Sequence, residues 1–142
     1  MGTRASETVM LHLVGVRVPA RNRVGEEGEG FAIAMATLDN SRPITAIFAV
    51  GIARAALEHA LAYARDRRQF GRPIADLQAI QFMLADMASD VEAARLLTWK
   101  AAWLLDDGQR NTLVSSHAKR FAADIAMKVA TDAVQIFGGY GY

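Results

Sequence analysis

Hydrophobic side chains recur with the 3.6-residue period of an α-helix from Phe31 onward, most clearly just after Pro43. The members of this first stripe are Ile44, Ile47, Phe48, Gly51, Ile52 and Ala55. Residues 39–43 read Asp-Asn-Ser-Arg-Pro, which places capping side chains ahead of a proline suited to the first turn of a helix. The pattern predicts a helix that starts here and runs to Gln69, where residues 70–73 (Phe-Gly-Arg-Pro) break it.

Two further helices are predicted from the same period. The second runs from about Ala75 to Leu105 and is closed by residues 106–108, Asp-Asp-Gly. Its stripe comprises Ile80, Met83, Leu84, Met87, Val91, Ala94 and Ala101. Further apolar side chains surround the rest of this helix: Leu96, Leu97, Trp99, Trp103 and Leu104. A helix that is apolar on more than one face usually packs against more than one neighbour.

The third predicted helix runs from about Thr112 to Phe137 and stops at Gly138 and Gly139. One of its faces is formed by Val114, Ala118, Phe121, Ile125, Val129 and Ala133. Three long helices joined by short loops indicate an all-α, antiparallel (up-down) bundle. Because the third helix ends almost at Tyr142, we expect this bundle to be one helix short.

The first 30 residues have a different pattern. Residues 9–19 are rich in valine and predict a β-strand that Pro19 ends. Residues 25–30 read Gly-Glu-Glu-Gly-Glu-Gly and predict a flexible acidic turn. This run is no phosphate-binding loop, because its glycines do not join a strand to a helix and its glutamates repel a pyrophosphate.

Composition and charge exclude several function classes. The 16 Lys and Arg nearly balance 15 Asp and Glu, so no basic footprint for nucleic acid or anionic lipid exists. The absence of cysteine excludes disulfides and thiolate chemistry. We expect no membrane span, because the apolar run at residues 43–53 is too short, and no signal peptide, because the N-terminus lacks an apolar core. These features favour a soluble, intracellular protein.

Neither catalytic hydrolysis nor metal binding is indicated by the serines and histidines. Ser116 and His117 are neighbours and point about 100° apart on a helix, so they do not face each other. The three histidines, His12, His59 and His117, have no metal-ligand spacing.

Three polar or glycine-rich segments each allow two interpretations. Arg65, Arg67 and Arg68 either compensate the negative end of a helix dipole or form a phosphate-binding helix end completed by Gln69 and the turn at Phe70. Residues 39–42 are sufficient as a helix cap, and a binding role for Arg42 requires a nearby anionic or carbonyl ligand. Residues 138–142 (Gly-Gly-Tyr-Gly-Tyr) are either a frayed helix end or a loop that a flat ligand can approach closely.

Taken together, the motifs resemble those of the acyl-CoA dehydrogenases over essentially the whole chain. In order they are residues 16–19 (Val-Arg-Val-Pro), 25–31 (Gly-Glu-Glu-Gly-Glu-Gly-Phe), 38–43 (Leu-Asp-Asn-Ser-Arg-Pro), 63–71 (Tyr-Ala-Arg-Asp-Arg-Arg-Gln-Phe-Gly), 77–81 (Leu-Gln-Ala-Ile-Gln), 84–87 (Leu-Ala-Asp-Met), 118–119 (Ala-Lys) and 133–141 (Ala-Val-Gln-Ile-Phe-Gly-Gly-Tyr-Gly). The straight-chain members that act on medium or short acyl chains look nearest.

This resemblance implies a place within a larger architecture. Family members have an N-terminal helical domain, a middle β-domain and a C-terminal four-helix bundle. Residues 1–30 would be the tail of the middle β-domain with a linker, and residues 31–142 most of the C-terminal bundle. Full-length members are usually homotetramers built as dimers of dimers, which would account for the apolar surface around the second helix. The location expected is the cytoplasm, or the mitochondrial matrix in a eukaryote.

The resemblance also implies which residues bind ligands. Those that would meet the cofactor FAD are Arg67, Arg68, Gln69, Phe70, Leu77, Gln78, Gln135, Ile136, Phe137, Gly138 and Gly139. The first four would reach the ADP part of an FAD held mainly by a neighbouring subunit. Asp39 and Arg42 would lie beside the thioester of an acyl-CoA substrate, and Arg110 near the phosphate end of CoA.

The chemistry implied is α,β-dehydrogenation of an acyl-CoA thioester. A carboxylate removes the α-proton, the β-hydrogen leaves as hydride to the flavin, and the electrons pass to an electron-transfer flavoprotein. In most members the base is a glutamate beyond the glycine-rich stretch, whereas here no glutamate follows Glu92. In a minority it stands just before the arginine of residues 38–43, where this chain has Ser41. We therefore expect no catalytic base among these 142 residues and an inactive isolated chain.

Two other hypotheses remain open at this stage. One is a structural helical bundle for oligomerisation that has lost its ligands. The other is a family relative with different flavin chemistry, such as an acyl-CoA oxidase or a flavin-dependent monooxygenase.

Overall fold

The computed structural model describes residues 4–142 and divides the chain into two compact units, Met1–Ile33 and Ala34–Tyr142. The first unit is mostly irregular, with a short 3₁₀ turn, η1, at Ala20–Asn22. Gly25 and Gly28 have positive φ angles of 71° and 89°, which form the predicted turn. In this turn the carboxylate of Glu29 accepts a hydrogen bond from the backbone N–H of Glu26 at 2.8 Å, just before the first helix begins.

The strand predicted over residues 9–19 is wrong, because the structure has no regular secondary structure before η1 in the residues that it describes. Valine-rich sequence favours a pleated, half-buried surface, but a strand also needs a neighbour to receive its backbone hydrogen bonds. No partner strand is present in this unit, and Val9, Leu11 and Val14 are more than half exposed.

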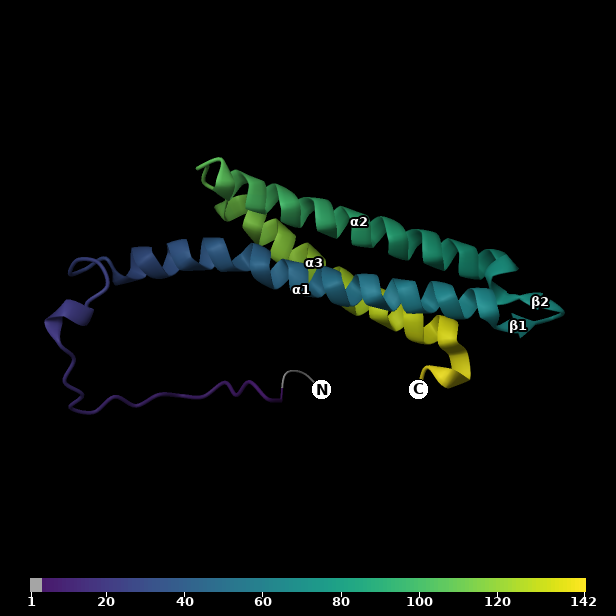
Figure 1. The fold of residues 1–142 in the computed structure, drawn as a ribbon, viewed down its shortest axis with the longest axis horizontal. Helices are drawn as coiled ribbons and strands as arrows, with labels where there is room; N and C mark the ends of the chain where they lie inside the picture. The colour runs from purple at the N-terminus through teal and green to yellow at the C-terminus, as the bar shows by residue number, and fades with distance from the viewer. Residues whose placement is uncertain (1–3) are drawn as a thin grey trace. The chain divides into compact units, whose positions relative to one another are not determined.

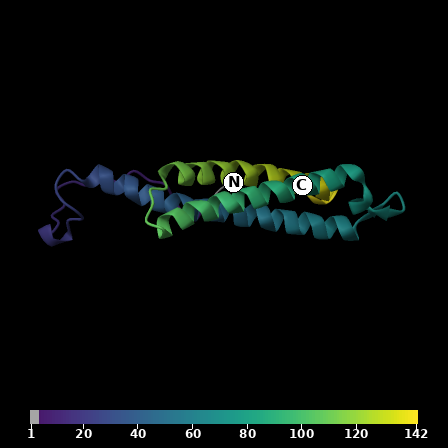
Figure 2. The same cartoon turned by 90° about the horizontal axis from the view of Figure 1, so that it is seen from above.

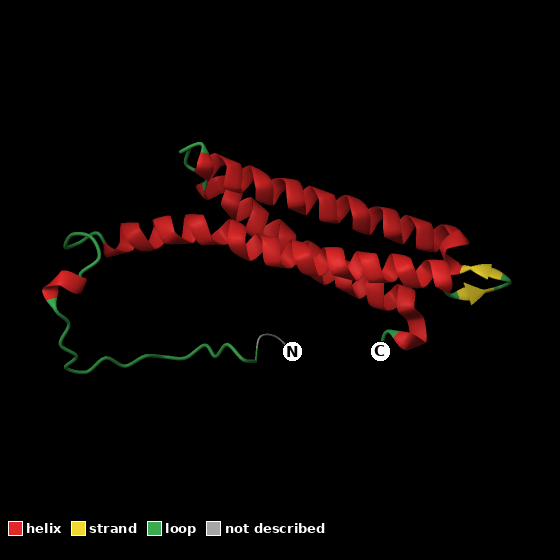
Figure 3. Cartoon of the chain, in the orientation of Figure 1, coloured by secondary structure: helices red, strands yellow, loops and turns green. Residues whose placement is uncertain are grey.

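The second unit is built from long helices and one small hairpin (Figures 1 and 3). In chain order the elements are α1 (Gly30–Asp66), β1 (Arg68–Gln69), β2 (Arg72–Pro73), η2 (Ile74–Asp76), α2 (Gln78–Asp106), α3 (Thr112–Phe137) and η3 (Gly138–Tyr140). From Ala34 onward α1, α2 and α3 run alternately in opposite directions and lie along one another (Figures 1 and 2). The predicted antiparallel helical bundle is confirmed.

The predicted start of the first helix at residues 39–43 is wrong. Helix α1 begins at Gly30 and continues through Pro43, which is buried inside it. A proline inside a helix removes the hydrogen bond to the carbonyl four residues earlier, here that of Asp39. The helix continues because the side-chain amide of Asn111 donates to that carbonyl at 3.4 Å. The predicted capping residues thus lie within the helix, and the donor that replaces the missing N–H of Pro43 comes from the N-cap of α3.

The face of α1 that is covered within the bundle is not the isoleucine and phenylalanine stripe. Ile44, Phe48 and Ile52 are 59%, 69% and 60% exposed. The covered face consists of smaller residues: Ala46, Val50, Ala53, Ala60 and Ala64. Both stripes have the helical period, so the period alone does not say which of them faces α2 and α3.

Helices α2 and α3 match their predicted stripes and make the closest contact between elements. Met87 and Val129 are fully buried at the centre of one core cluster, which also includes Ile125 and Ile136. A second cluster is rich in alanine and comprises Ala46, Val50, Ala94, Ala101, Ala118 and Ala122. Helix α3 has the bounds that the sequence predicted, Thr112–Phe137. Helix α2 begins at Gln78, later than Ala75, because the 3₁₀ turn η2 comes first.

Helix α1 is long and apolar enough to cross a membrane by length and composition, with an 18-residue window of mean hydropathy 1.5. Alanine and valine raise this hydropathy, and the buried ones pack into the cores shared with α2 and α3. Only 22% of this window is buried within the chain, so length, composition and burial do not decide the matter, and the absence of a membrane span stays a prediction.

We predict that Met87→Ala lowers the free energy of unfolding by about 2–5 kcal/mol, because it removes a fully buried side chain and leaves a cavity. Urea unfolding followed by far-UV circular dichroism measures this. Met127→Ala is the matched control, since Met127 is 71% exposed on α3, and it should change stability by less than about 0.5 kcal/mol. Equal effects of the two substitutions would contradict the assigned core.

An ion pair between Lys128 of α3 and Asp90 of α2, at 2.8 Å, gives a pH-dependent prediction. The hydrogen bond with Asp90 raises the pKa of Lys128 above its ordinary value of 10.5. Because the folded-state pKa is raised, the stabilisation is fully present below the unfolded pKa and is lost as pH rises through the folded pKa. Lys128→Met should therefore lower the free energy of unfolding by roughly 0.2–1 kcal/mol at pH 7. At a pH where Lys128 of the unchanged chain is neutral, the two chains should have the same stability.

Differences in urea midpoint between Lys128→Met and the unchanged chain, measured at neutral and strongly alkaline pH, test this. Lys119→Met is the control, because Lys119 is exposed on the same helix and has no ion pair among the described residues. A loss that persists undiminished at strongly alkaline pH would rule out the ion pair as its cause.

Candidate functional site

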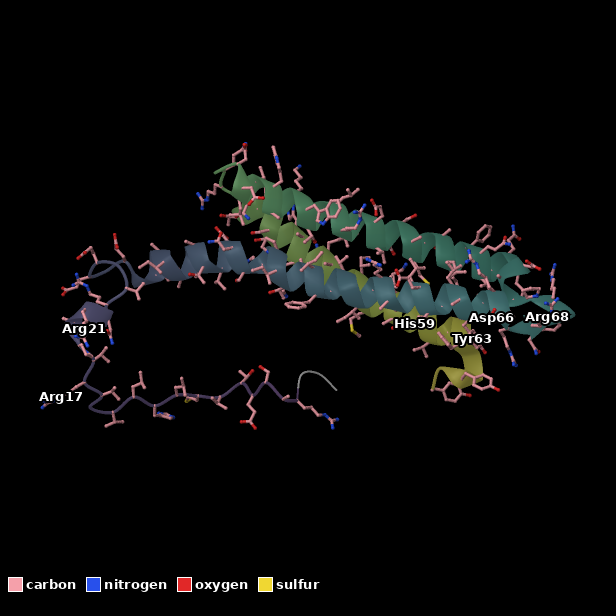
Figure 4. The ribbon with its side chains drawn as sticks, viewed as in Figure 1. Arg17, Arg21, His59, Tyr63, Asp66 and Arg68 are labelled. Carbon is pink, nitrogen blue, oxygen red and sulfur yellow. The ribbon has the colours of Figure 1, made fainter. Side chains whose placement is uncertain are left out.

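A tight hairpin at the end of α1 positions the arginine and glutamine that the sequence singled out. The helix ends at Asp66, earlier than the predicted Gln69, and β1 and β2 pair antiparallel with Gln69 opposite Arg72. Phe70 and Gly71 have φ angles of 54° and 78°, the two successive positive values of a type I′ hairpin turn. A bulky residue rarely adopts such an angle, which is why the sequence did not indicate the hairpin. Figure 4 shows Tyr63 and Asp66 near the end of α1 and Arg68 in the hairpin.

Beside this hairpin the structure forms a hollow of about 310 Å³ between the ends of α1 and α3. It is lined by Tyr63, Arg67, Gln69, Ile74, Ile136, Phe137, Gly138, Gly139 and Tyr140. Six of these belong to the cofactor residues implied by the resemblance, and they come from two segments almost 70 positions apart in the chain. The fold thus brings the two predicted cofactor segments together, apart from the residues described below.

Aromatic rings form one wall of the hollow. The rings of Tyr63 and Phe137 stack with centroids 4.4 Å apart and planes inclined by 24°. The ring of Tyr140 lies 6.4 Å from that of Tyr63, and the guanidinium of Arg67 lies 5.5 Å from the Tyr140 ring centroid. An offset stack and a cation over a ring are both favourable arrangements. The arrangement provides a flat apolar surface with a cation beside it.

Three residues of this hollow are not among the predicted cofactor residues: Tyr63, Ile74 and Tyr140, although the sequence already allows residues 138–142 as a loop that a flat ligand can approach. Tyr63 could have been found, because it stands four positions before Arg67 and therefore on the same face of α1. Ile74 and Tyr140 are contributed by short 3₁₀ turns, whose conformations carry no clear periodic signal.

Five of the predicted cofactor residues lie outside the hollow. Arg68, Phe70 and Gln78 are exposed, Phe70 at 87%, as is Gln135 on α3. Leu77 packs against the core cluster around Met87 instead. The structure therefore gathers six of the predicted cofactor residues around the hollow and leaves these five outside its lining.

The three predicted substrate residues, Asp39, Arg42 and Arg110, gather at the other end of the bundle. Arg42 donates to the carboxylate of Asp39 at 2.6 Å. The hydroxyl of Thr112 donates to the second oxygen of that carboxylate and accepts from Nε of Arg110 at 3.1 Å. Residues from α1 and from the loop before α3 thereby form one hydrogen-bonded group.

A second hollow, of about 410 Å³, adjoins this group and is lined by Arg110, Thr112, Leu113 and Ser116. Sequence reasoning did not assign Thr112 or Ser116 to a site. Ser41, at the alternative base position that the resemblance implies, donates its hydroxyl hydrogen to the carbonyl of Leu38 at 3.3 Å, and among residues 4–142 it has no hydrogen bond to a basic side chain that could activate it.

Comparison with known proteins gives the following matches. The family model described as acyl-CoA dehydrogenase, C-terminal domain, matches residues 28–142. The short-chain specific acyl-CoA dehydrogenase of Megasphaera elsdenii is 52% identical over 142 residues, which are 100% of this chain and 37% of that protein. The structure of butyryl-CoA dehydrogenase from Megasphaera elsdenii matches with a TM-score of 0.87 and 54% identity, covering 88% of this chain and 33% of that one.

A chain in a structure of the electron transferring flavoprotein of Acidaminococcus fermentans matches with a TM-score of 0.86 and 55% identity, over 88% of this chain and 33% of that one. These values confirm both the resemblance inferred from the motifs and the fold class. This chain spans about a third of the length of the relatives that it matches.

We predict that Gly138→Ala destabilises the chain, because Gly138 ends α3 with φ 58° and ψ −131°, a conformation that side chains disfavour. The expected loss is about 1–3 kcal/mol in urea unfolding. Gly139→Ala is the matched control, since Gly139 has no positive φ and an added Cβ meets nothing within 4 Å. A loss for Gly139→Ala as large as that for Gly138→Ala would argue against backbone strain as the reason.

Proposed function

This chain belongs to the acyl-CoA dehydrogenase family, as its C-terminal helical domain, and from this premise we propose that it is part of an FAD-dependent enzyme that desaturates acyl-CoA thioesters. The single observation that carries the proposal is the hollow that joins Arg67 and Gln69 to residues 136–139. The motif resemblance assigns both segments to one cofactor, and their separation in the sequence alone gives no reason for them to meet.

The residues of the hollow fit one end of FAD. Tyr63, Phe137 and Tyr140 provide a flat apolar surface for an aromatic ring, and Gly138 and Gly139 let a ligand approach the backbone. Arg67 supplies a permanent positive charge and several donors for a diphosphate. In this proposal the hollow holds the ADP part, with Arg68, Gln69, Phe70, Leu77, Gln78 and Gln135 contributing around it. The flavin, when bound, supplies the hydride acceptor.

Asp39, Arg42 and Arg110 form the proposed acyl-CoA end of the domain. Asp39 orients the planar guanidinium of Arg42 by an ion pair. The side chain of Arg42 is 29% exposed and that of Asp39 is 20% exposed, so a ligand can still contact the guanidinium. Arg110 adjoins the hollow before α3 and is suited to a phosphate of CoA. The proposed role of these residues is to bind and orient the thioester and its CoA, since none of the three is assigned to proton removal.

The proposed reaction needs more than these 142 residues. Within these 142 residues no glutamate follows Glu92, and Ser41, at the alternative base position, carries a hydroxyl that donates to the carbonyl of Leu38. We propose that the base and the remaining flavin contacts come from segments that the longer relatives have, with residues 1–30 as the end of a middle β-domain. The isolated chain is then inactive in dehydrogenation.

Partners follow from the same proposal. Exposed apolar side chains on α1 and α2, among them Phe48, Trp99 and Trp103, form a surface of the kind that contacts other protein. A homo-oligomer, arranged as a dimer of dimers, would cover it. The proposed electron acceptor is an electron-transfer flavoprotein, and the likeness to a chain in a structure of such a protein supports it. The proposed compartment is the cytoplasm, or the mitochondrial matrix in a eukaryote.

The test uses a chimera in which residues 1–142 replace the matched stretch of the Megasphaera elsdenii short-chain enzyme, alongside the isolated chain. After gel filtration with FAD, the chimera should retain flavin and be bleached by a straight-chain acyl-CoA under anaerobic conditions. The isolated chain should retain no flavin. A folded chimera without flavin would contradict the proposal and favour a purely structural bundle. A chimera reoxidised rapidly by oxygen would favour an oxidase.

Within the chimera, we predict that Arg67→Ala weakens FAD binding at least tenfold, because charge-assisted hydrogen bonds worth roughly 1.5–3 kcal/mol are lost. The flavin-to-protein absorbance ratio after dilution and gel filtration measures the loss. Arg65→Ala is the control, since Arg65 is exposed two positions earlier and does not line the hollow. Unchanged flavin content in Arg67→Ala would remove Arg67 from the site.

A further inference from the structure

Asp39 is held by two consecutive residues at the start of α3, the N-cap Asn111, which binds its backbone, and Thr112, which binds its side chain. The carbonyl of Asp39 is the one that Pro43 deprives of a helical donor. The amide of Asn111 donates to it at 3.4 Å and to the carbonyl of Ala101 at 3.1 Å. Asn111 is 2% exposed, so its amide is shielded from solvent and makes its hydrogen bonds to the backbone of α1 and α2.

The hydroxyl of Thr112 fixes the carboxylate of the same aspartate. A hydroxyl has one hydrogen, which Thr112 gives to Asp39, and its lone pairs accept from Nε of Arg110. The second carboxylate oxygen accepts from Arg42. Two guanidinium groups from distant parts of the chain thereby share one carboxylate, Arg42 by a direct hydrogen bond and Arg110 through the hydroxyl of Thr112.

The donors that remain unused matter for binding. Arg110 uses only Nε, and within residues 4–142 both of its terminal nitrogens are without a protein partner. Arg42 uses one terminal nitrogen on Asp39. One carboxylate shared by two arginines leaves a net positive charge beside the hollow of about 410 Å³. Such a group favours an anionic ligand with oxygens that accept paired hydrogen bonds.

We infer that Asn111 and Thr112 are positioning residues, which set the Asp39–Arg42 pair and Arg110 in register to bind one ligand, with the terminal nitrogens of Arg110 available to its anionic part. The inference rests on the proposed function only for the identity of that ligand, a CoA thioester. The hydroxyl of Thr112 is the decisive group. Without it Arg110 loses the partner that orients it, and the Asp39 carboxylate loses a donor, while neither arginine is removed.

The test compares Thr112→Val, which keeps the shape and removes the hydroxyl, with Thr112→Ser, which keeps the hydroxyl. Coenzyme A is titrated into the isotopically labelled 142-residue chain, and NMR reports the Kd and the Nε–H resonance of Arg110. Thr131→Val is the matched control on the same helix, because among the described residues the hydroxyl of Thr131 binds only the carbonyl of Met127.

Thr112→Val is expected to raise the Kd for coenzyme A about tenfold and to shift the Arg110 resonance, while Thr112→Ser and Thr131→Val leave both unchanged. A merely structural role of Thr112 predicts a fall in stability with an unchanged Kd for coenzyme A, because the Arg110 signal moves whenever its hydrogen bond to the hydroxyl is lost. The inference is overturned if Thr112→Val binds like the unchanged chain, or if Thr112→Ser loses as much as Thr112→Val.

Failure of the proposed function has a different signature. If the unchanged chain does not bind coenzyme A, the substrate assignment of Asp39, Arg42 and Arg110 fails, and the positioning role fails with it. Asn111→Ala provides a second readout, because loss of its amide should speed hydrogen exchange in the helical turn that precedes Pro43. Unchanged exchange in a folded Asn111→Ala chain overturns the part assigned to Asn111.

Discussion

The missing N–H of Pro43 is the constraint on which much of this bundle depends. A helix of 37 residues with a buried proline leaves one carbonyl without its usual donor, and a buried unpaired carbonyl is costly. The amide of Asn111 supplies the donor and also binds the carbonyl of Ala101, so that one side chain ties together α1, the end of α2 and the start of α3. The charged group around Asp39 is built on this junction.

The two ends of the bundle carry different kinds of surface. The hairpin end has aromatic rings, glycines and one oriented arginine, whereas the loop end has two arginines and a shared carboxylate. About 27 helical residues separate Asp39 from the end of α1, which corresponds to about 40 Å at the rise of an α-helix. The two ends of the bundle would therefore contact different ligands or different parts of one ligand. The distance between the two ends is fixed by the helices that join them.

Packing within the chain uses small side chains and leaves large ones outside. Alanines dominate the core between α1 and its neighbours, while Phe48, Trp99 and Trp103 are more than half exposed. Burial of alanine contributes less than burial of a large side chain, so the unit relies on Met87, Val129 and the isoleucines of α3 for much of its stability. Contact with another protein surface would bury these large exposed side chains and thereby add to the stability of the complex.

The sequence by itself determined the three helices, the bounds of α3, the inward stripes of α2 and α3 and the family, because side-chain period and local motifs are properties of short segments. Only the tertiary structure decided that α1 continues through Pro43, because the replacement donor, Asn111, lies 72 positions from the carbonyl that it binds. It likewise decided which stripe of α1 is covered and left residues 9–19 without a strand. The proximity of Arg67 to residues 136–139, and of Arg42 to Arg110, depends on how the helices pack, and no local pattern encodes a distance between helix ends.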